Sequence, residues 1–273
     1  MGCGGVSAGD GGFKGDPALW RVLAGAADVA ALLWEKGWAE ANAGNLSCDV
    51  TDVAWDAREA ERMLPLPAAF PELGGRRILV TGAGSRMREL AREPERFCGV
   101  LDLAPDGASG GVLRADAGRG FAPTSELPSH LAIHAALRRR GLPQRAVVHT
   151  HPTELLALSH DAALLEADRL SRALCSMHPE VILAAPDGVA LVRYLPPGSA
   201  EQGAAAGAAM ERHRVALWEK HGAVAVGADF AEAFDRIDVV NKAARLLLLC
   251  RAARYDPDGL TAAQVEEVRR ATS

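Results

Sequence analysis

Several stretches of this chain repeat apolar residues every three or four positions, which is the spacing of a helix that buries one face. The first covers about residues 17–41, and its shared face carries Leu19, Val22, Leu23, Ala26, Val29, Ala30 and Leu33. A second begins after Ser125, a residue that can cap a helix, and its leucines fall on one stripe. The pattern predicts helices at about 17–41, 127–140, 200–213 and 230–254.

Shorter runs rich in β-branched and apolar residues lie between these helices, as expected for buried strands. No internal repeat and no clear domain linker interrupts the alternation. We expect strands at 77–81, 99–103, 111–115, 146–151, 181–184, 189–194, 215–218 and 223–226.

The first residues are different, because they are rich in glycine and carry no apolar period. Such a low-complexity segment cannot bury enough apolar surface to order itself. We therefore expect residues 1–16 to be a disordered N-terminal extension and residues 17–273 to form one folded domain. The Met-Gly start does not indicate myristoylation, because position 6 is valine and no basic patch follows.

Composition narrows the classes of protein further. The 273 residues can bury a full core, and 30 basic against 35 acidic residues give a formal net charge of −5. That balance offers no broad basic surface, so we expect no nucleic-acid partner.

No apolar run approaches 20 residues, so we expect no transmembrane helix and no membrane partner. Five scattered cysteines, without a Cys-x-x-Cys pair or a secretory signal, suit a reducing cytoplasm.

Three histidines are the strongest candidates for chemistry. His149 and His151 are two apart in a predicted strand, so their side chains point to the same face and could share one ion. His221 opens another strand-like run. A closed structural zinc site needs four protein ligands, whereas three histidines suit a catalytic ion that still binds water or substrate. The His-x-His pair alone is a weak signal and gains weight only from its neighbours.

Glu126 is the neighbour that matters most. It follows the capping residue Ser125, and on an isolated helix it would be read simply as a carboxylate favoured by the helix dipole. Beside an open metal site, a glutamate on a rigid turn is a good general base. Removing a proton from carbon beside a carbonyl needs such a base and a positive charge near the oxygen.

For the other candidate groups, structural roles are favoured over catalytic or metal-binding ones. The glycine-rich segment 81–86 could cradle a phosphate or be a plain turn, and it lacks a dinucleotide fingerprint, so we expect no NAD. His130 and His134 are four apart, and we interpret them as partly buried helix residues rather than ligands. Lysine is scarce, which favours a metal over a lysine imine as the electron sink. We expect surface positions for His160, His178 and His213, and core or interface positions for Trp34 and Trp38.

The order of these motifs resembles that of the class II aldolases in the aldolase/adducin superfamily, and most closely the branch that acts on rhamnulose 1-phosphate. The resemblance spans about residues 18–255 and is more specific than any one motif. The matching stretches are 36–40, 42–47, 80–84, 123–128, 148–153, 186–189, 197–199 and 217–222.

The resemblance implies a three-layer α/β/α domain with a mixed, mainly antiparallel central sheet, in a homotetramer with active sites at subunit boundaries. It also implies one divalent metal ion per chain, Zn²⁺ above others, held by His149, His151 and His221, with Glu126 as the catalytic carboxylate. The residues that fall where the family holds the substrate phosphate are Asn42, Gly44, Asn45, Gly84, Thr124 and Ser125.

Two positions depart from the pattern of the resembled branch. Ser176 stands where that branch has a second glutamate that donates a proton in a neighbouring subunit's site, and serine cannot do this unaided. His178 and Glu180 are close enough in sequence to substitute. Ala83 stands where the phosphate loop has serine, so one phosphate hydrogen bond could be missing.

The expected function is therefore a cytoplasmic, metal-dependent aldolase that reversibly cleaves a ketose 1-phosphate, with L-rhamnulose 1-phosphate as the leading substrate. The products would be dihydroxyacetone phosphate and a short aldehyde such as L-lactaldehyde. Two alternatives stay open. One is a sugar-phosphate epimerase or dehydratase on the same scaffold. The other is a non-catalytic, metal-stabilised oligomer of the adducin kind.

Overall fold

The computed structural model describes residues 16–53, 60, 62–115, 121–166 and 168–271. The expected disorder of residues 1–16 falls almost wholly outside this part of the chain. Only Asp16 is described, and its carboxylate caps the first helix by accepting hydrogen bonds from the backbone N–H groups of Ala18 and Leu19.

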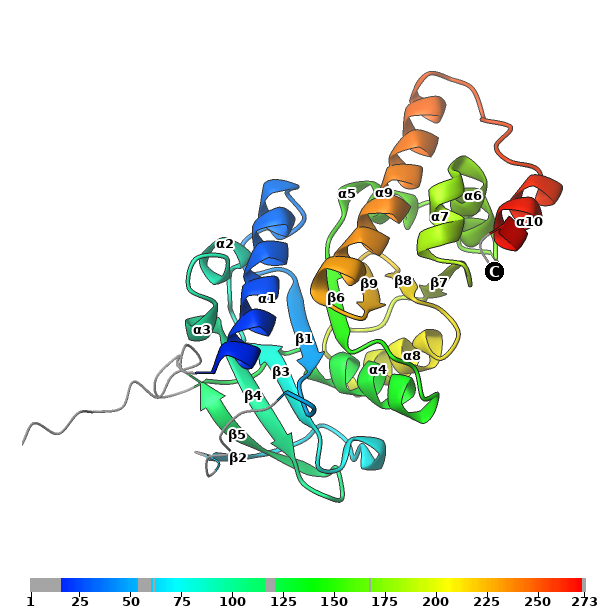
Figure 1. Cartoon of the computed structure of the whole chain (residues 1–273). Coiled ribbons are helices and arrows are strands. Elements are labelled where there is room, and N and C mark those ends of the chain that lie inside the picture. The colour runs from blue at the N-terminus through cyan, green and yellow to red at the C-terminus, as the bar shows by residue number, and fades with distance from the viewer. Residues whose placement is uncertain (1–15, 54–59, 61, 116–120, 167, 272–273) are drawn as a thin grey trace, which may run out of the picture.

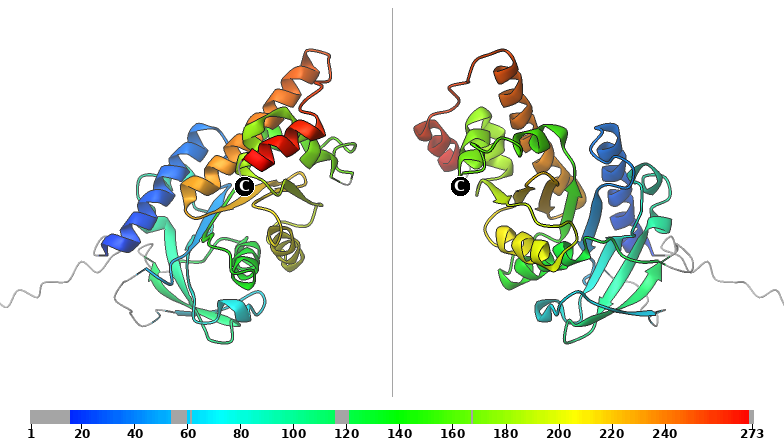
Figure 2. Two further views of the ribbon diagram at one scale, coloured as in Figure 1. Left: turned by 45° about the vertical axis from the view of Figure 1, so that its right-hand side comes forward. Right: turned by 180° about the vertical axis from the view of Figure 1, so that it is seen from behind.

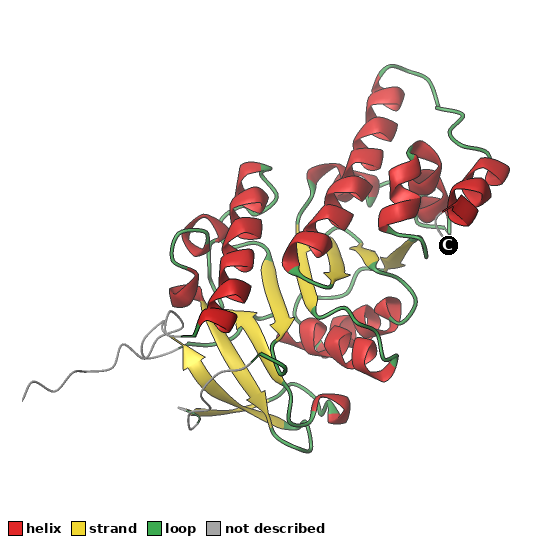
Figure 3. Ribbon diagram, viewed as in Figure 1, coloured by secondary structure: helices red, strands yellow, loops and turns green. Residues whose placement is uncertain are grey.

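One twisted sheet runs through the described part of the chain (Figures 1 and 3). Its nine strands lie in the order β2-β5-β4-β3-β1-β6-β9-β8-β7, and every neighbouring pair is antiparallel except β7 with β8. The strands are β1 (Asn45–Asp49), β2 (Arg62–Pro65), β3 (Arg77–Thr81), β4 (Cys98–Leu103), β5 (Ser109–Ala115), β6 (Ala146–Thr150), β7 (Val189–Val192), β8 (Val215–Trp218) and β9 (Gly222–Gly227).

Helices cover both faces of this sheet (Figure 2). One layer contains α1 (Pro17–Glu35), α2 (Met87–Leu90), α3 (Pro94–Phe97), α5 (Thr153–Leu158), α6 (Arg169–Met177), α7 (Pro179–Ala184) and α9 (Phe230–Ala252), with α10 (Ala262–Ala271) packed outside α6 and α7. The other contains α4 (Leu127–Arg139), α8 (Ala200–Met210) and the 3₁₀ turn Pro71–Leu73. The expected three-layer α/β/α fold with a mixed, mainly antiparallel sheet is confirmed.

Alternate residues along the central strands bury themselves in different layers. In β6, Val148 packs into the cluster under α1 and α9, while Val147 packs into the cluster under α4 and α8. Successive side chains of a strand point to opposite faces, and both faces of this sheet are covered by helices. The sequence of the strand is therefore one continuous apolar run.

Helix α1 is shorter than the apolar period suggested. It ends at Glu35 because Gly37 adopts a left-handed φ of +70°, and the backbone N–H of Trp38 turns back to the carbonyl of Leu33. By length and composition α1 could cross a membrane, a property that core helices share. Here the leucines of its apolar face are fully buried in the main cluster.

One predicted strand is wrong. Residues 181–184 belong to α7, because Pro179 occupies the first helical turn and the His178 imidazole caps the N–H of Glu180. A short apolar run has no period that separates strand from helix, and here the capping residues decide. The apolar pattern does not predict β1, β2 or the short helices α2, α3, α5, α6 and α10.

Candidate active site

The three histidines come together at one end of the central strands. His149 lies in β6, and His151 follows directly after that strand ends. His221 sits in the tight turn between β8 and β9, where Lys220 takes a left-handed φ of +58°. One ring nitrogen from each histidine lies within 4.8 Å of the others, so a single ion can reach all three.

Glycine at position 222 makes this convergence possible. A Cβ atom at Gly222 would lie 2.8 Å from Cδ2 of His151 and 2.9 Å from Cε1 of His149. Any other residue here would push the two imidazoles apart. Trp218 completes the packing by stacking on His149 with ring centroids 4.5 Å apart.

The outer nitrogen of each imidazole has its own partner. Nδ1 of His149 lies 3.0 Å from the carbonyl oxygen of Ala223, to which it donates. Nδ1 of His151 lies 2.8 Å from a carboxylate oxygen of Glu40, and Nδ1 of His221 lies 2.9 Å from the Gln202 carboxamide. Such partners fix the rings of metal-binding histidines.

His149 shows why the site suits a cation. With Nδ1 donating to Ala223, its buried Nε2 carries a lone pair and has no hydrogen-bond partner among the described residues. That nitrogen lies 3.2 Å from Oε2 of Glu126, so two acceptors face each other. Burial lowers the pKa of His149 to about 3, so a proton does not bridge them at neutral pH. A divalent ion among the imidazoles would remove this conflict.

Glu126 is held at the centre of the cluster, at the start of α4, and only 6 % of its surface is exposed. Its Oε1 lies 2.9 Å from Nε2 of His221, and its Oε2 accepts a hydrogen bond of 2.9 Å from the amide of Asn45. Burial acts to raise the pKa of Glu126, but the neighbouring imidazoles and the Asn45 bond outweigh it and hold the pKa below its usual value. The group is a carboxylate at neutral pH.

A buried chain of hydrogen bonds continues behind Glu126. Asn45 uses its amide nitrogen on Glu126 and accepts from the ring of His130 through its oxygen. Ser47 lies 2.6 Å from the other nitrogen of His130 and 2.8 Å from Nε2 of His134. Because Asn45 must donate to the carboxylate, the donors are ordered from His134 through Ser47 and His130 to Asn45. We expected the two histidines to be only partly buried, yet 1 % and 2 % of their surfaces are exposed.

Every predicted site residue lines one cavity of about 160 Å³. Its walls come from three turns that are distant in sequence, at residues 42–45, 82–84 and 124–126, together with the imidazoles. The backbone joins the last two turns, since Thr124 N–H donates to the carbonyl of Thr81 and Ala83 N–H to that of Ala122. Among the described residues, no lysine or arginine lines this cavity.

The two departures from the family pattern lie in different surroundings. Ala83 lines the cavity itself. Ser176 lies on α6, where its hydroxyl donates to the carbonyl of Ala173 and its side chain packs against Gly259. The side chains of His178 and Glu180 lie against each other and border a separate charged hollow of about 700 Å³.

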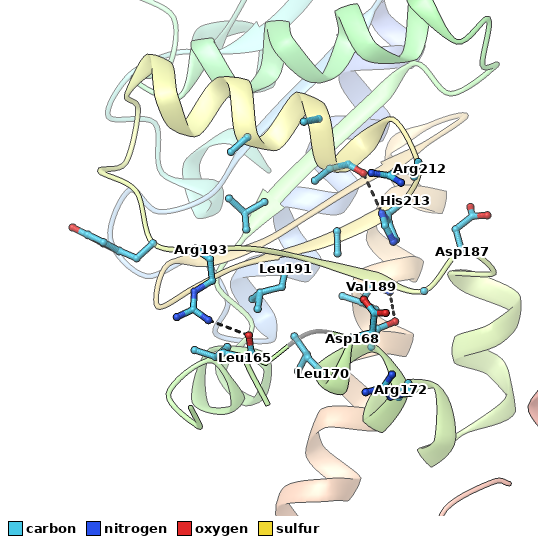
Figure 4. Close-up of a pocket in the computed structure, with 18 of the residues that line it drawn as sticks. Leu165, Asp168, Leu170, Arg172, Asp187, Val189, Leu191, Arg193, Arg212 and His213 are labelled. Carbon is cyan, nitrogen blue, oxygen red and sulfur yellow. Dashed lines mark hydrogen bonds between the residues drawn. The ribbon is translucent and has the colours of Figure 1, made fainter. Parts of the chain in front are cut away.

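A larger hollow of about 940 Å³ lies elsewhere, beside the edge strand β7 (Figure 4). Figure 4 shows that apolar side chains such as Leu170 and Leu191 and charged ones such as Asp168 and Arg193 both line it. It contains none of the three clustered histidines, so its size does not mark the reactive centre.

Sequence reasoning missed the groups that support the site rather than those that form it. Glu40 and Gln202 were not identified, and Asn45 was assigned only to phosphate. The serine and glutamine at positions 199 and 202 have the spacing of a helix capping box, which was the available signal for Gln202. Nothing in the sequence signals that Glu40 meets His151.

Fold and site together define a class of protein. Residues 24–248 match the family described as Class II Aldolase and Adducin N-terminal domain, so the chain belongs to the class II aldolase/adducin family.

Among its relatives is a rhamnulose-1-phosphate aldolase of Bacteroides thetaiotaomicron, 38 % identical over 258 residues that cover 92 % of this chain and 94 % of the relative. The rhamnulose-1-phosphate aldolase of Klebsiella pneumoniae is 33 % identical over 226 residues, covering 79 % of each chain. The crystal structure of a sugar-phosphate aldolase from Thermotoga maritima superimposes with a TM-score of 0.75 at 33 % identity, covering 88 % of this chain and 99 % of that one.

Proposed function

We propose that this protein is a metal-dependent aldolase that reversibly cleaves L-rhamnulose 1-phosphate to dihydroxyacetone phosphate and L-lactaldehyde. The relatives named for this reaction support the substrate. The observation that carries the proposal is the convergence of three imidazoles and the Glu126 carboxylate in one cavity, walled by glycine-rich turns.

His149, His151 and His221 are the proposed ligands of one divalent ion, Zn²⁺ first among the metals that imidazole accepts. The unpartnered Nε2 of His149 supports this assignment. When bound, the ion supplies a Lewis acid beside the substrate's carbonyl and hydroxyl oxygens.

Glu126 is the proposed general base. Its carboxylate lies beside the proposed ion site, and Asn45 holds one of its oxygens in a fixed position. It would carry the proton to and from the reacting carbon of dihydroxyacetone phosphate, a role for which a buried and oriented carboxylate is suited.

The substrate phosphate would occupy the opposite wall of the cavity, at Asn42, Gly44, Asn45, Gly84, Thr124 and Ser125. The described residues that line the cavity include no lysine or arginine, so neutral amide and hydroxyl donors would bind the phosphate. Asn45 also holds Glu126, so it would connect the phosphate site to the base.

A second proton-transfer group is needed at the leaving aldehyde, and Ser176 is unsuited to the task. His178 and Glu180 are the proposed substitutes, because they lie close to Ser176 in the sequence and both side chains are partly exposed. The proposed assembly is a cytoplasmic homotetramer with its active sites at subunit boundaries, and light scattering after size exclusion tests the subunit number.

The direct test is a product assay with the zinc-loaded protein. L-Rhamnulose 1-phosphate should release dihydroxyacetone phosphate, and L-fuculose 1-phosphate, which differs in stereochemistry, should be cleaved more slowly. Release of dihydroxyacetone phosphate only from another ketose phosphate would refute the substrate. Epimerised or dehydrated products, or no product at all, would refute the aldolase.

A further inference from the structure

Gln202 is a buried carboxamide whose position at the site is not explained by the proposed chemistry. It lies in the first turn of α8 and only 2 % of its surface is exposed. Its Oε1 accepts a hydrogen bond of 2.7 Å from the backbone N–H of Gly198. Its Nε2 lies 2.9 Å from Nδ1 of His221. The side chain therefore bridges a loop and a proposed metal ligand.

The direction of these two bonds follows from the backbone. A backbone N–H can only donate, so the carboxamide oxygen must face Gly198 and the NH₂ group must face His221. The helix cap reinforces this arrangement, since Ser199 Oγ accepts from the N–H of Gln202 at 3.1 Å. Nδ1 of His221 must then accept a hydrogen bond and cannot carry a proton.

His221 is consequently unlike its neighbour His149. A neutral imidazole has one N–H, so that of His221 is on Nε2, where it donates to Oε1 of Glu126 at 2.9 Å. His149 has its proton on Nδ1, facing the carbonyl of Ala223, and presents the Nε2 lone pair to the centre. An ion can bind His149 as it stands, whereas Nε2 of His221 is blocked by its proton.

We propose that Gln202 is a positioning residue that holds His221 in the Nε2–H tautomer, which cannot bind metal through Nε2. Metal loading then requires the Gln202 carboxamide to flip, so that Oε1 and Nε2 exchange places. This rests on the proposed function only in taking the ion to bind Nε2 of His221. A flipped carboxamide lets Oε1 accept from Nδ1–H, but it places NH₂ against the N–H of Gly198 and breaks that partly buried hydrogen bond. His221 can thus bind the ion only after this flip. The ion is therefore bound more weakly than it would be if residue 202 were a pure hydrogen-bond acceptor.

The tautomer is tested first, on metal-free wild-type protein. ¹⁵N NMR of the histidine rings distinguishes Nδ1–H from Nε2–H, and a His221→Asn variant identifies the His221 signal. We expect Nε2–H for His221 and Nδ1–H for His149. Nδ1–H at His221 in the metal-free protein would overturn the proposal. This arm needs neither the ion nor activity.

Metal affinity is tested next, with Zn²⁺ and a competing chelator. Glutamate at position 202 can accept from both Gly198 and His221, so Gln202→Glu should bind Zn²⁺ about 10- to 100-fold more tightly and show Nδ1–H at His221 without metal. The matched control is Gln264→Glu on the exposed face of α10, which should leave affinity unchanged. Equal affinity in wild type and Gln202→Glu would overturn the proposal. Failure of both to bind zinc would refute the ion site of the proposed function, and the NMR result would still decide the role of Gln202.

Discussion

Each histidine of the site is oriented by a different kind of residue. A backbone carbonyl holds His149, a carboxylate holds His151 and a carboxamide holds His221. The three rings also differ in exposure, with 1 % of the His149 side chain exposed against 17 % and 12 % for the other two. His149 is therefore the proposed ligand whose side chain is least accessible to solvent.

Substitution His149→Ala should remove the ion and abolish activity while the fold survives, because a large apolar core does not need a metal to hold it together. Metal analysis should fall from about one transition metal per chain to a trace. Circular dichroism should remain that of the wild type. Full metal occupancy in a His149→Ala/His151→Ala double variant would contradict the assignment.

The buried pair His130 and His134 makes stability depend on pH. Burial lowers the pKa of His130 to about 3 and that of His134 to about 4, from 6.5. The unfolded chain therefore binds protons that the folded chain does not, between about pH 6.5 and 4. The free energy of unfolding should fall as the pH drops through this window and stay level above it.

Substitution His134→Gln should reduce this dependence, because it removes the proton that the unfolded state takes up at that position. The slope of unfolding free energy against pH should decrease by up to about 1.4 kcal/mol per pH unit. Urea unfolding between pH 4.5 and 7.5 measures it, with the exposed His160→Gln as the control. Parallel curves for wild type and His134→Gln would contradict this account.

Among the elements, those with a long period or a continuous β-branched run could be predicted from the sequence. Strands β3 and β8 have the predicted bounds, and α4 differs by one residue. Strand β1 was missed, because Asn45–Asp49 alternates polar side chains that a one-dimensional pattern assigns to solvent. Those polar groups are buried because Asn45 bonds to Glu126, just before α4, and both Asn45 and Ser47 bond to His130 of α4. Local spacing carries no information about such partners.

Helix α6 sets the surroundings of Ser176. The carbonyl of Ser176 accepts from the N–H of Leu260, and a Cβ atom at Gly259 would lie 2.8 Å from its hydroxyl. The small side chain therefore lets the segment before α10 dock against α6. A carboxylate at position 176 would collide with that segment before it could reach another subunit.

Substitution Ser176→Glu should cost about 1–3 kcal/mol of stability, the usual effect of overpacking. It should also speed proteolysis between α9 and α10, because that segment would be displaced. Ser176→Ala, which adds no volume, is the control and should behave like the wild type. A stable Ser176→Glu protein with faster cleavage of substrate would show instead that this position can still supply the proton donor.

At the scale of the molecule, the apolar core and the cavity at the three histidines are formed by different residues. In the part of the chain that the structure describes, three apolar clusters hold the sheet between its helix layers, and the cavity lies where the turns 42–45, 82–84 and 124–126 meet the ends of central strands. Metal should therefore add to stability without creating the fold.

Removal of the ion by a chelator should lower the melting temperature while unfolding stays cooperative. Zinc at about 100 times its dissociation constant should contribute about 2.7 kcal/mol, because it binds only the folded state. Calorimetry with and without zinc measures this. Loss of cooperative unfolding in the chelated protein would mean that the metal is structural.

Exchange of carbon-bound hydrogen in dihydroxyacetone phosphate with heavy water tests the central claim most directly, because in the proposed mechanism it needs the ion and Glu126 but no aldehyde. Wild-type protein loaded with zinc should exchange one such hydrogen, and chelated protein should not. Glu126→Gln should still bind zinc and exchange about 10²–10⁴-fold more slowly. Exchange near the wild-type rate in Glu126→Gln, or in protein stripped of metal, would contradict the account.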